Sequence, residues 1–272
     1  MRQLRARRTF AITLLIIVSI GYLWLDHALK TSFQPAAQIS GTLLFCLLLV
    51  LTFFNGRKKM PFLPLLKATT WMQFHIYVGY FTIFLCAIHA GFKIPSGGLD
   101  ITIAALFAAV SLSGLFGLII SRTMPSRLTV HGENLMFERI PGLRRTLRTE
   151  VEDLVVSSVE STGSSTIADF YEKHLADFFG RPQYCGAHLL GSKKPLHQML
   201  EKIEGLNRYL DEDERAIMAN IAERVRAKDN LDFQWYGQGI LKLWLFVHIP
   251  LSFGLLIFAA MHGLLGWKFA DT

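Results

Sequence analysis

Long apolar stretches alternate with short polar connections over most of the chain. Five stretches consist mainly of hydrophobic residues, at about 9–25, 38–54, 69–92, 101–121 and 238–267. A helix needs about 20 such residues to cross the hydrocarbon core of a membrane. The pattern therefore predicts an all-α integral membrane protein with five transmembrane helices, the second of which is the shortest.

A polar segment about the size of a small domain separates the fourth and fifth stretches. Loose alternation over 126–140 suggests a strand pair, whereas helical spacing follows at 165–179 and at 195–227. The last of these is read as one helix or as two in series, with a second start near Asp211–Glu214. The polar run 229–232 is expected to interrupt the helical pattern before the fifth span.

These patterns divide the chain into three parts. We expect the first four spans in 1–121, a mainly helical cytoplasmic insertion in 122–236, and the fifth span with a short outer tail in 237–272.

Composition and charge support this organisation and add an orientation. The chain is 51% hydrophobic, has a mean hydropathy of +0.35 and still carries 18% charged residues. Lys and Arg gather at the N-terminus, in 55–67 and after Ser121, which are separated by even numbers of spans. No small-residue cleavage site follows the first stretch, so we expect an uncleaved first helix. The positive-inside rule then predicts an inner N-terminus and an outer C-terminus, and we expect the membrane to be a bacterial inner membrane. This topology accounts for the net charge of +7, so no nucleic-acid partner is needed.

Four histidines lie within the third and fifth stretches, in two pairs with the same spacing. His75 and His89 are fourteen residues apart, as are His248 and His262. Fourteen residues fall about 40° short of four turns and rise about 21 Å, so each pair lies near one face of its helix at two depths. In both stretches a Trp stands four residues before the first His. Because the two spans run in the same direction, we expect His75 to face His248 and His89 to face His262.

Two facing pairs of imidazoles are the ligands of two stacked b-type haems. Two neutral imidazoles saturate haem iron, which leaves no open site for a substrate and suits electron transfer. The chain contains no C-x-x-C-H motif for covalent haem attachment. We therefore expect two haem b groups, one on each pair, with glycine and alanine near the ligands leaving room for the porphyrins. The alternative is that each histidine bonds to a neighbouring helix, the tryptophans only anchor the spans and the small residues only pack.

The arrangement resembles the di-haem b-type cytochromes of the ferric reductase and NADPH oxidase transmembrane family. These also carry two histidines on the third span and two on the fifth. A more distant similarity is to cytochrome b of the quinol–cytochrome c oxidoreductases. The chain departs from the first family in having no sixth span, no flavin and nicotinamide domains and no G-x-G-x-x-G fingerprint. The resemblance thus implies the electron conduit and not the reductase chemistry.

We therefore expect an electron-transfer subunit of a quinol-linked oxidoreductase rather than a complete enzyme. Its partners would be membrane lipid, the quinone pool and an outer-side redox protein such as a c-type cytochrome, with electrons moving in either direction. One alternative is a transporter or channel whose membrane histidines bind a metal ion or relay protons, although the apolar cores contain no Asp or Glu. Another is an anchor subunit whose insertion docks a catalytic partner.

Two further sets of polar residues are candidate sites. His174, Cys185, His188 and His197 fall within 24 residues and could form a zinc site, but we favour surface or packing roles for them. His27 at the outer end of the first span is read as interfacial, with a quinone pocket as the alternative.

Overall fold

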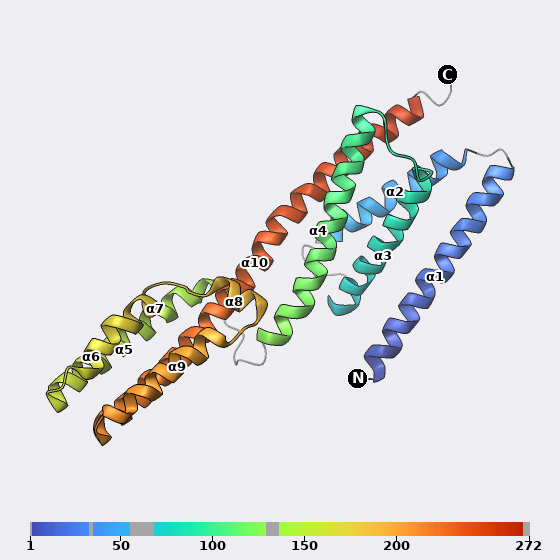
Figure 1. Cartoon of the computed structure of the whole chain (residues 1–272). Helices are drawn as coiled ribbons and strands as arrows, with labels where there is room; N and C mark the ends of the chain where they lie inside the picture. The colour runs from blue at the N-terminus through green and yellow to red at the C-terminus, as the bar shows by residue number, and fades with distance from the viewer. Residues whose placement is uncertain (1, 33–34, 55–67, 129–135, 269–272) are drawn as a thin grey trace, which may run out of the picture. The chain divides into compact units, whose positions relative to one another are not determined.

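The computed structural model describes residues 2–32, 35–54, 68–128 and 136–268, and their side chains except those of 2–8, 68–69 and 123–128. These residues are almost entirely helical and contain no strand (Figure 1), which confirms the expected all-α class. The chain divides into two compact units, 1–118 with 244–272, and 119–243. The boundaries expected from the sequence were 121/122 and 236/237.

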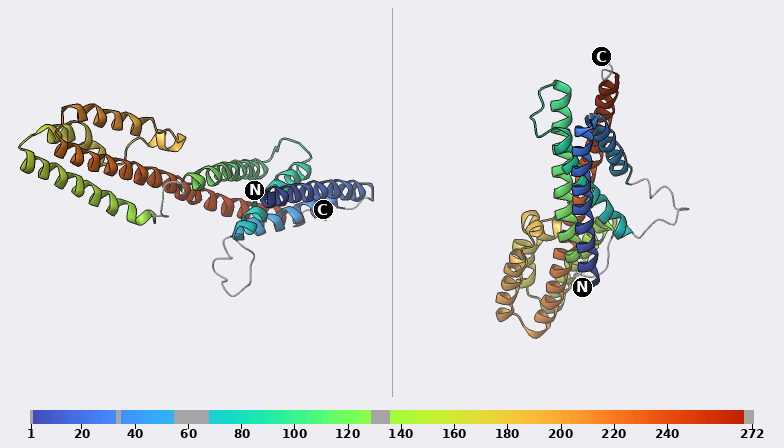
Figure 2. Two further views of the ribbon diagram at one scale, coloured as in Figure 1. Left: turned by 90° about the horizontal axis from the view of Figure 1, so that it is seen from below. Right: turned by 90° about the vertical axis from the view of Figure 1, so that its right-hand side faces the viewer.

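Among its described residues, the first unit contains five helices. They are α1 (Arg2–Thr31), α2 (Ala36–Thr52), α3 (Ala68–His89), most of α4 (Gly98–Leu128) and the C-terminal part of α10 (Glu212–Lys268). Helices α1, α2 and α3 contact one another, and α4 lies beside α10 (Figures 1 and 2).

Four of these helices are long and apolar enough to cross a membrane, namely α1, α3, α4 and α10. The chain is therefore a multi-pass membrane protein. Helix α2 is apolar but has 17 residues, a length of about 26 Å at the helical rise. That length is at the lower end for a spanning helix, so the fifth span stays a prediction.

The distribution of hydrophobic side chains in this unit is the reverse of that in a water-soluble protein. Few of its described side chains are buried, and most of its large hydrophobic side chains are exposed. The buried set comprises Tyr22, Ser40, Leu48, Thr82, Leu85 and Leu255. An apolar surface of this extent is stable against lipid tails and unstable against water. Its natural surroundings are membrane lipid.

The contact between α4 and α10 depends on one glycine. A Cβ atom added at Gly117 would stand 1.9 Å from the ring of Trp244, so the indole packs directly on the α4 backbone. The Trp244 Nε1–H donates to the carbonyl of Ser113 at 2.8 Å, which fixes the ring in that position. Close approach through small residues is the usual means of helix packing in membranes.

The second unit is a bundle of shorter helices around one apolar core. Its elements are the end of α4, η3 (Phe137–Arg139), α5 (Ile140–Thr162), α6 (Thr166–Phe170), the π-helical η4 (Tyr171–Leu175), α7 (Ala176–Gly180), α8 (Cys185–Leu190), α9 (Lys194–Leu206), η5 (Asn207–Tyr209) and the N-terminal part of α10. The side chains of Met218, Ile221, Ala222 and Val225 show the spacing of one helical face and are buried in this core.

The sequence predicted some of these boundaries and missed others. The segment 195–227 is indeed two helices in series, α9 and the start of α10. Where α10 begins, the side chain of Glu214 accepts a hydrogen bond from the backbone N–H of Asp211 at 3.1 Å, which is one half of a capping box. The strand pair over 126–140 is wrong for the described residues, since 126–128 belong to α4 and 137–140 to η3 and α5. The expected interruption at 229–232 is also wrong, because α10 runs through it.

Substitution of Gly117 tests the packing of α4 on α10. We expect Gly117→Val to lower the thermal unfolding midpoint by the equivalent of about 1–3 kcal/mol, the usual cost of overpacking, because the new side chain displaces the Trp244 ring. The measurement is thermal unfolding of the detergent-solubilised full chain.

Gly21→Val is the matched control, since Gly21 also lies in an apolar helix but a Cβ there meets nothing within 4 Å. Equal destabilisation by both substitutions would contradict a specific role for Gly117.

Candidate functional site

The four membrane histidines lie on the inward faces of α3 and α10. The residue midway between His75 and His89 is Thr82, and the residue midway between His248 and His262 is Leu255. Each midpoint residue is seven positions from both histidines, about 20° from the same helical face. Thr82 is 2% exposed and Leu255 1% exposed, whereas most of each helix is not buried. Both histidine-bearing faces therefore point into the unit.

One expected pair of imidazoles faces across the gap between the two helices. The ring centres of His89 and His262 lie 6.5 Å apart, and their planes are nearly perpendicular at 85°. A metal–imidazole bond is about 2 Å long and the ring centre lies about 1 Å beyond the nitrogen, so two imidazoles on one metal have centres about 6 Å apart. The spacing of this pair fits a shared metal ion without movement of either helix.

A serine on α2 contacts the outer ring nitrogen of His89. The Ser40 hydroxyl lies 2.9 Å from the carbonyl of Ala37 and 2.8 Å from Nδ1 of His89. A hydroxyl both donates and accepts, so it satisfies Nδ1 in either tautomer. In the tautomer with the proton on Nδ1, the Nε2 lone pair is available to a metal. The neighbouring Gly41 lets the ring approach, since a Cβ there would stand 3.1 Å from it.

His248 has a matching environment on α4. Its Nδ1 lies 3.1 Å from the Ser113 hydroxyl, and a Cβ at Gly114 would stand 3.7 Å from its ring. The Trp244 ring stacks on the imidazole, with ring centres 5.3 Å apart. A Ser-Gly dipeptide on α2 thus contacts His89 of α3, and a second Ser-Gly dipeptide on α4 contacts His248 of α10.

His75 differs from the others in having no polar partner. Its Nδ1 is shut off from solvent and makes no hydrogen bond among the described residues. Phe54 contacts the imidazole at 4.6 Å between ring centres, and Trp71 stacks on Phe54 and donates to its carbonyl. His248 is near enough to His75 for electrostatic interaction, as expected for the second pair. A buried unpaired imidazole nitrogen is costly in an apolar span, and such groups are usually functional.

A carboxylate accompanies His262. Asp100, in the first turn of α4, places an oxygen 3.1 Å from Nδ1 of His262. The two side chains are 50% and 46% exposed, so this pair lies in a more open position than His75. A carboxylate on the outer nitrogen of a metal-binding histidine is a common second ligand shell, because it orients the ring and raises its basicity.

The two histidine-bearing helices are loosely packed against each other. The backbones of α3 and α10 make at most isolated close contacts, so the two helices meet mainly through side chains. A Cβ added at Gly79, one turn after His75, or at Gly254 meets nothing within 4 Å. The imidazole donors and the ring spacing of His89 and His262 are compatible with a bis-imidazole metal site at that level.

Comparison with protein-family models, with curated proteins and with solved structures finds no match to this chain.

The second cluster of possible ligands does not form a metal site in the described part of the chain. No group of three or more His, Cys, Asp or Glu side chains there is arranged to hold a bare metal ion. His188 is buried and stacks on Tyr236, and burial lowers its pKa. Cys185 is exposed, and His197 is exposed beside Glu201. His27 on α1 is also exposed, in agreement with the interfacial reading.

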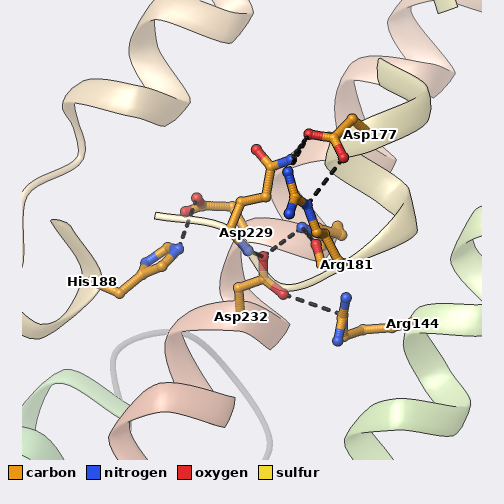
Figure 3. Close-up of polar contacts among 8 residues, drawn as sticks. Arg144, Asp177, Arg181, His188, Asp229 and Asp232 are labelled. Atoms are coloured by element: carbon orange, nitrogen blue, oxygen red, sulfur yellow. Dashed lines mark hydrogen bonds and ion pairs between the residues drawn. The ribbon is translucent and has the colours of Figure 1, made fainter. Parts of the chain in front are cut away.

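A buried charge network holds the second unit together at the point where the sequence predicted an interruption. Asp232 contacts Lys228 one turn earlier on α10, Arg144 on α5 at 3.2 Å and the backbone N–H of Gln183 at 3.1 Å (Figure 3). Lys228 also donates to the carbonyl of Arg181. Burial lowers the pKa of Lys228, and the charge of Asp232 opposes that shift. The network joins α10 to α5 and to the 181–183 loop, which is a structural role.

Sequence reasoning missed the polar partners of the histidines. Ser40, Ser113 and Asp100 come from helices that were counted only as spans. One signal was present, because the second and fourth apolar stretches each contain a Ser-Gly dipeptide, at 40–41 and 113–114. A hydroxyl beside the smallest residue is the pattern that a closely packed ring with a polar nitrogen requires.

Removal of Asp232 tests the structural role of the charge network. We expect Asp232→Asn to destabilise the second unit by about 3–5 kcal/mol, the cost of leaving buried positive partners uncompensated. Thermal unfolding of the full chain should show a large fall in the midpoint. Asp177→Asn is the control, because Asp177 pairs with Arg181 at the surface and its loss should leave the midpoint nearly unchanged. Similar small effects of both would contradict the role given to Asp232.

Proposed function

We propose that the chain is a di-haem b-type cytochrome that moves electrons across the membrane. His75 and His248 would hold one haem and His89 and His262 the other. The observation that carries the proposal is the distance of 6.5 Å between the ring centres of His89 on α3 and His262 on α10. Imidazole is a common metal ligand, so the two helices present a pair of candidate ligands to each other. The contact of Ser40 with Nδ1 of His89 supports it further, because a metal-binding histidine commonly hydrogen-bonds through its outer ring nitrogen.

The residues of the chain define the chemistry of such a site. Haem iron with two imidazole ligands carries single electrons and has no open position for a substrate. The fourteen-residue spacing sets the two sites about 21 Å apart along the helices, so together they span most of the hydrocarbon core. The Nδ1 atom of His75 is closed to solvent, whereas His262 and Asp100 are about half exposed. No catalytic residue is part of the proposal.

The partners follow from this chemistry. A bis-imidazole conduit needs a donor at one end and an acceptor at the other, and we assign these to the quinone pool and to an outer-side redox protein such as a c-type cytochrome. The chain would then be an electron-transfer subunit of a quinol-linked oxidoreductase. The exposed apolar helices supply the contact with membrane lipid.

Haem content tests the proposal directly. The purified wild type should show the spectrum of a reduced b-type cytochrome and contain two haems per chain. His262→Ala should lose one haem and keep the other, because the second pair of ligands is intact, and His75→Ala should lose the complementary one. The measurement is a haem assay with reduced-minus-oxidised spectra.

His27→Ala is the matched control, an exposed histidine of the same unit that should leave both haems in place. A wild-type protein without haem absorbance would contradict the proposal. It would favour the alternative, a transporter or a proton or metal relay that uses the same histidines. Full haem content in both His→Ala variants would show that the ligand assignment is wrong.

The orientation in the membrane is a separate proposal. We place the N-terminus and the second unit on the cytoplasmic side of the bacterial inner membrane and the C-terminus outside, from the positive-inside rule. Cys185 is an exposed cysteine of the second unit and serves as a natural reporter. A Cys46→Ala, Cys86→Ala background should show no labelling by an impermeant maleimide in intact spheroplasts and full labelling after lysis. Labelling of Cys185 before lysis would reverse the orientation.

A further inference from the structure

The two proposed sites differ in the groups that contact the outer ring nitrogens of their histidines. At one site, His262 has the carboxylate of Asp100 at 3.1 Å and His89 has the hydroxyl of Ser40 at 2.8 Å. At the other, Nδ1 of His248 lies 3.1 Å from the Ser113 hydroxyl, and Nδ1 of His75 is buried with no hydrogen-bond partner among the described residues. Within the part of the chain that the structure describes, one site therefore has an anionic partner and the other has none.

We propose that Asp100, acting through His262, gives the His89–His262 site a lower reduction potential than the His75–His248 site. This inference rests on the proposed function. Asp100 is a positioning residue in this account, since it touches the ligand and not the iron.

The electronic effect of Asp100 sets the sign. An anion on Nδ1 draws the ring proton toward itself and makes Nε2 a stronger electron donor. A stronger donor stabilises ferric iron, which bears one more positive charge than ferrous iron, and the negative charge of Asp100 favours the same state. Both effects lower the potential of the site that contains His262.

Burial acts in the same direction. The side chains of His262 and Asp100 are about half exposed, whereas the Nδ1 atom of His75 is closed to solvent. Water and polar surroundings stabilise the more highly charged ferric state, and an apolar enclosure destabilises it. The His75–His248 site is thus the better electron acceptor, and with one electron per chain the iron there is ferrous while the other is ferric.

Redox titration of the two sites tests the inference. In the wild type we expect two separate midpoint potentials. Asp100→Asn should raise the lower midpoint, leave the upper one in place and narrow the gap, because it removes the charge and keeps the shape of the side chain. Asp177→Asn is the control, a surface carboxylate of the second unit paired with Arg181, which should move neither midpoint.

Single-site variants assign the midpoints. In His75→Ala, which keeps the His89–His262 site, Asp100→Asn should shift the one remaining midpoint upward, and in His262→Ala it should have no effect. If these variants fold poorly, the shift of the lower midpoint by Asp100→Asn alone carries the test.

The outcomes separate the two claims. Two haems whose potentials are unaffected by Asp100→Asn, or a lower midpoint at the His75–His248 site, would overturn the inference and leave the cytochrome intact. Absence of haem from the wild type would overturn the proposed function as well.

Discussion

The membrane unit depends on whether the Nδ1 atom of each membrane histidine has a partner on a neighbouring helix. A polar ring atom inside an apolar span is costly unless it has a partner. Ser40 gives Nδ1 of His89 that partner at 2.8 Å. With Nδ1 hydrogen-bonded on α2, Nε2 is the ring nitrogen that the proposed function assigns to the metal.

Different helices carry the histidines and support them. Helices α3 and α10 carry the four histidines and meet mainly through side chains. Helix α2 approaches α3 through Gly41, which contacts the His89 ring, and α4 approaches α10 through Gly114 and Gly117, which contact His248 and the Trp244 indole. The supports are not equivalent at the two levels, because a carboxylate stands beside His262, whereas Nδ1 of His75 has no hydrogen-bond partner among the residues that the structure describes. Four histidines at matched spacing therefore have different neighbours, and that asymmetry is the basis of the proposed potential difference.

The sequence predicted what depends on periodicity and missed what depends on contacts between distant segments. The apolar stretches and the fourteen-residue spacing were enough to place the histidines on one face of each helix, since both follow from helix geometry. Ser40, Ser113 and Asp100 could not be assigned, because nothing in the spacing within α3 or α10 says which residues of α2 and α4 meet the rings. The predicted interruption at 229–232 failed for the same reason. Asp232 is neutralised by Arg144, almost ninety positions earlier in the chain, so a run that looks like a polar break is the buried centre of a helix.

The electron paramagnetic resonance spectrum of the oxidised, purified protein tests the central claim most directly. Two imidazoles on one ferric iron produce a low-spin signal, and perpendicular ring planes make that signal strongly anisotropic. With the planes of His89 and His262 at 85°, we expect such a signal from this site, and we expect His262→Ala to remove that component while the signal of the His75–His248 site remains. A protein with no low-spin ferric signal, or a signal that survives the loss of His262 unchanged, would contradict the pairing of these histidines on one iron.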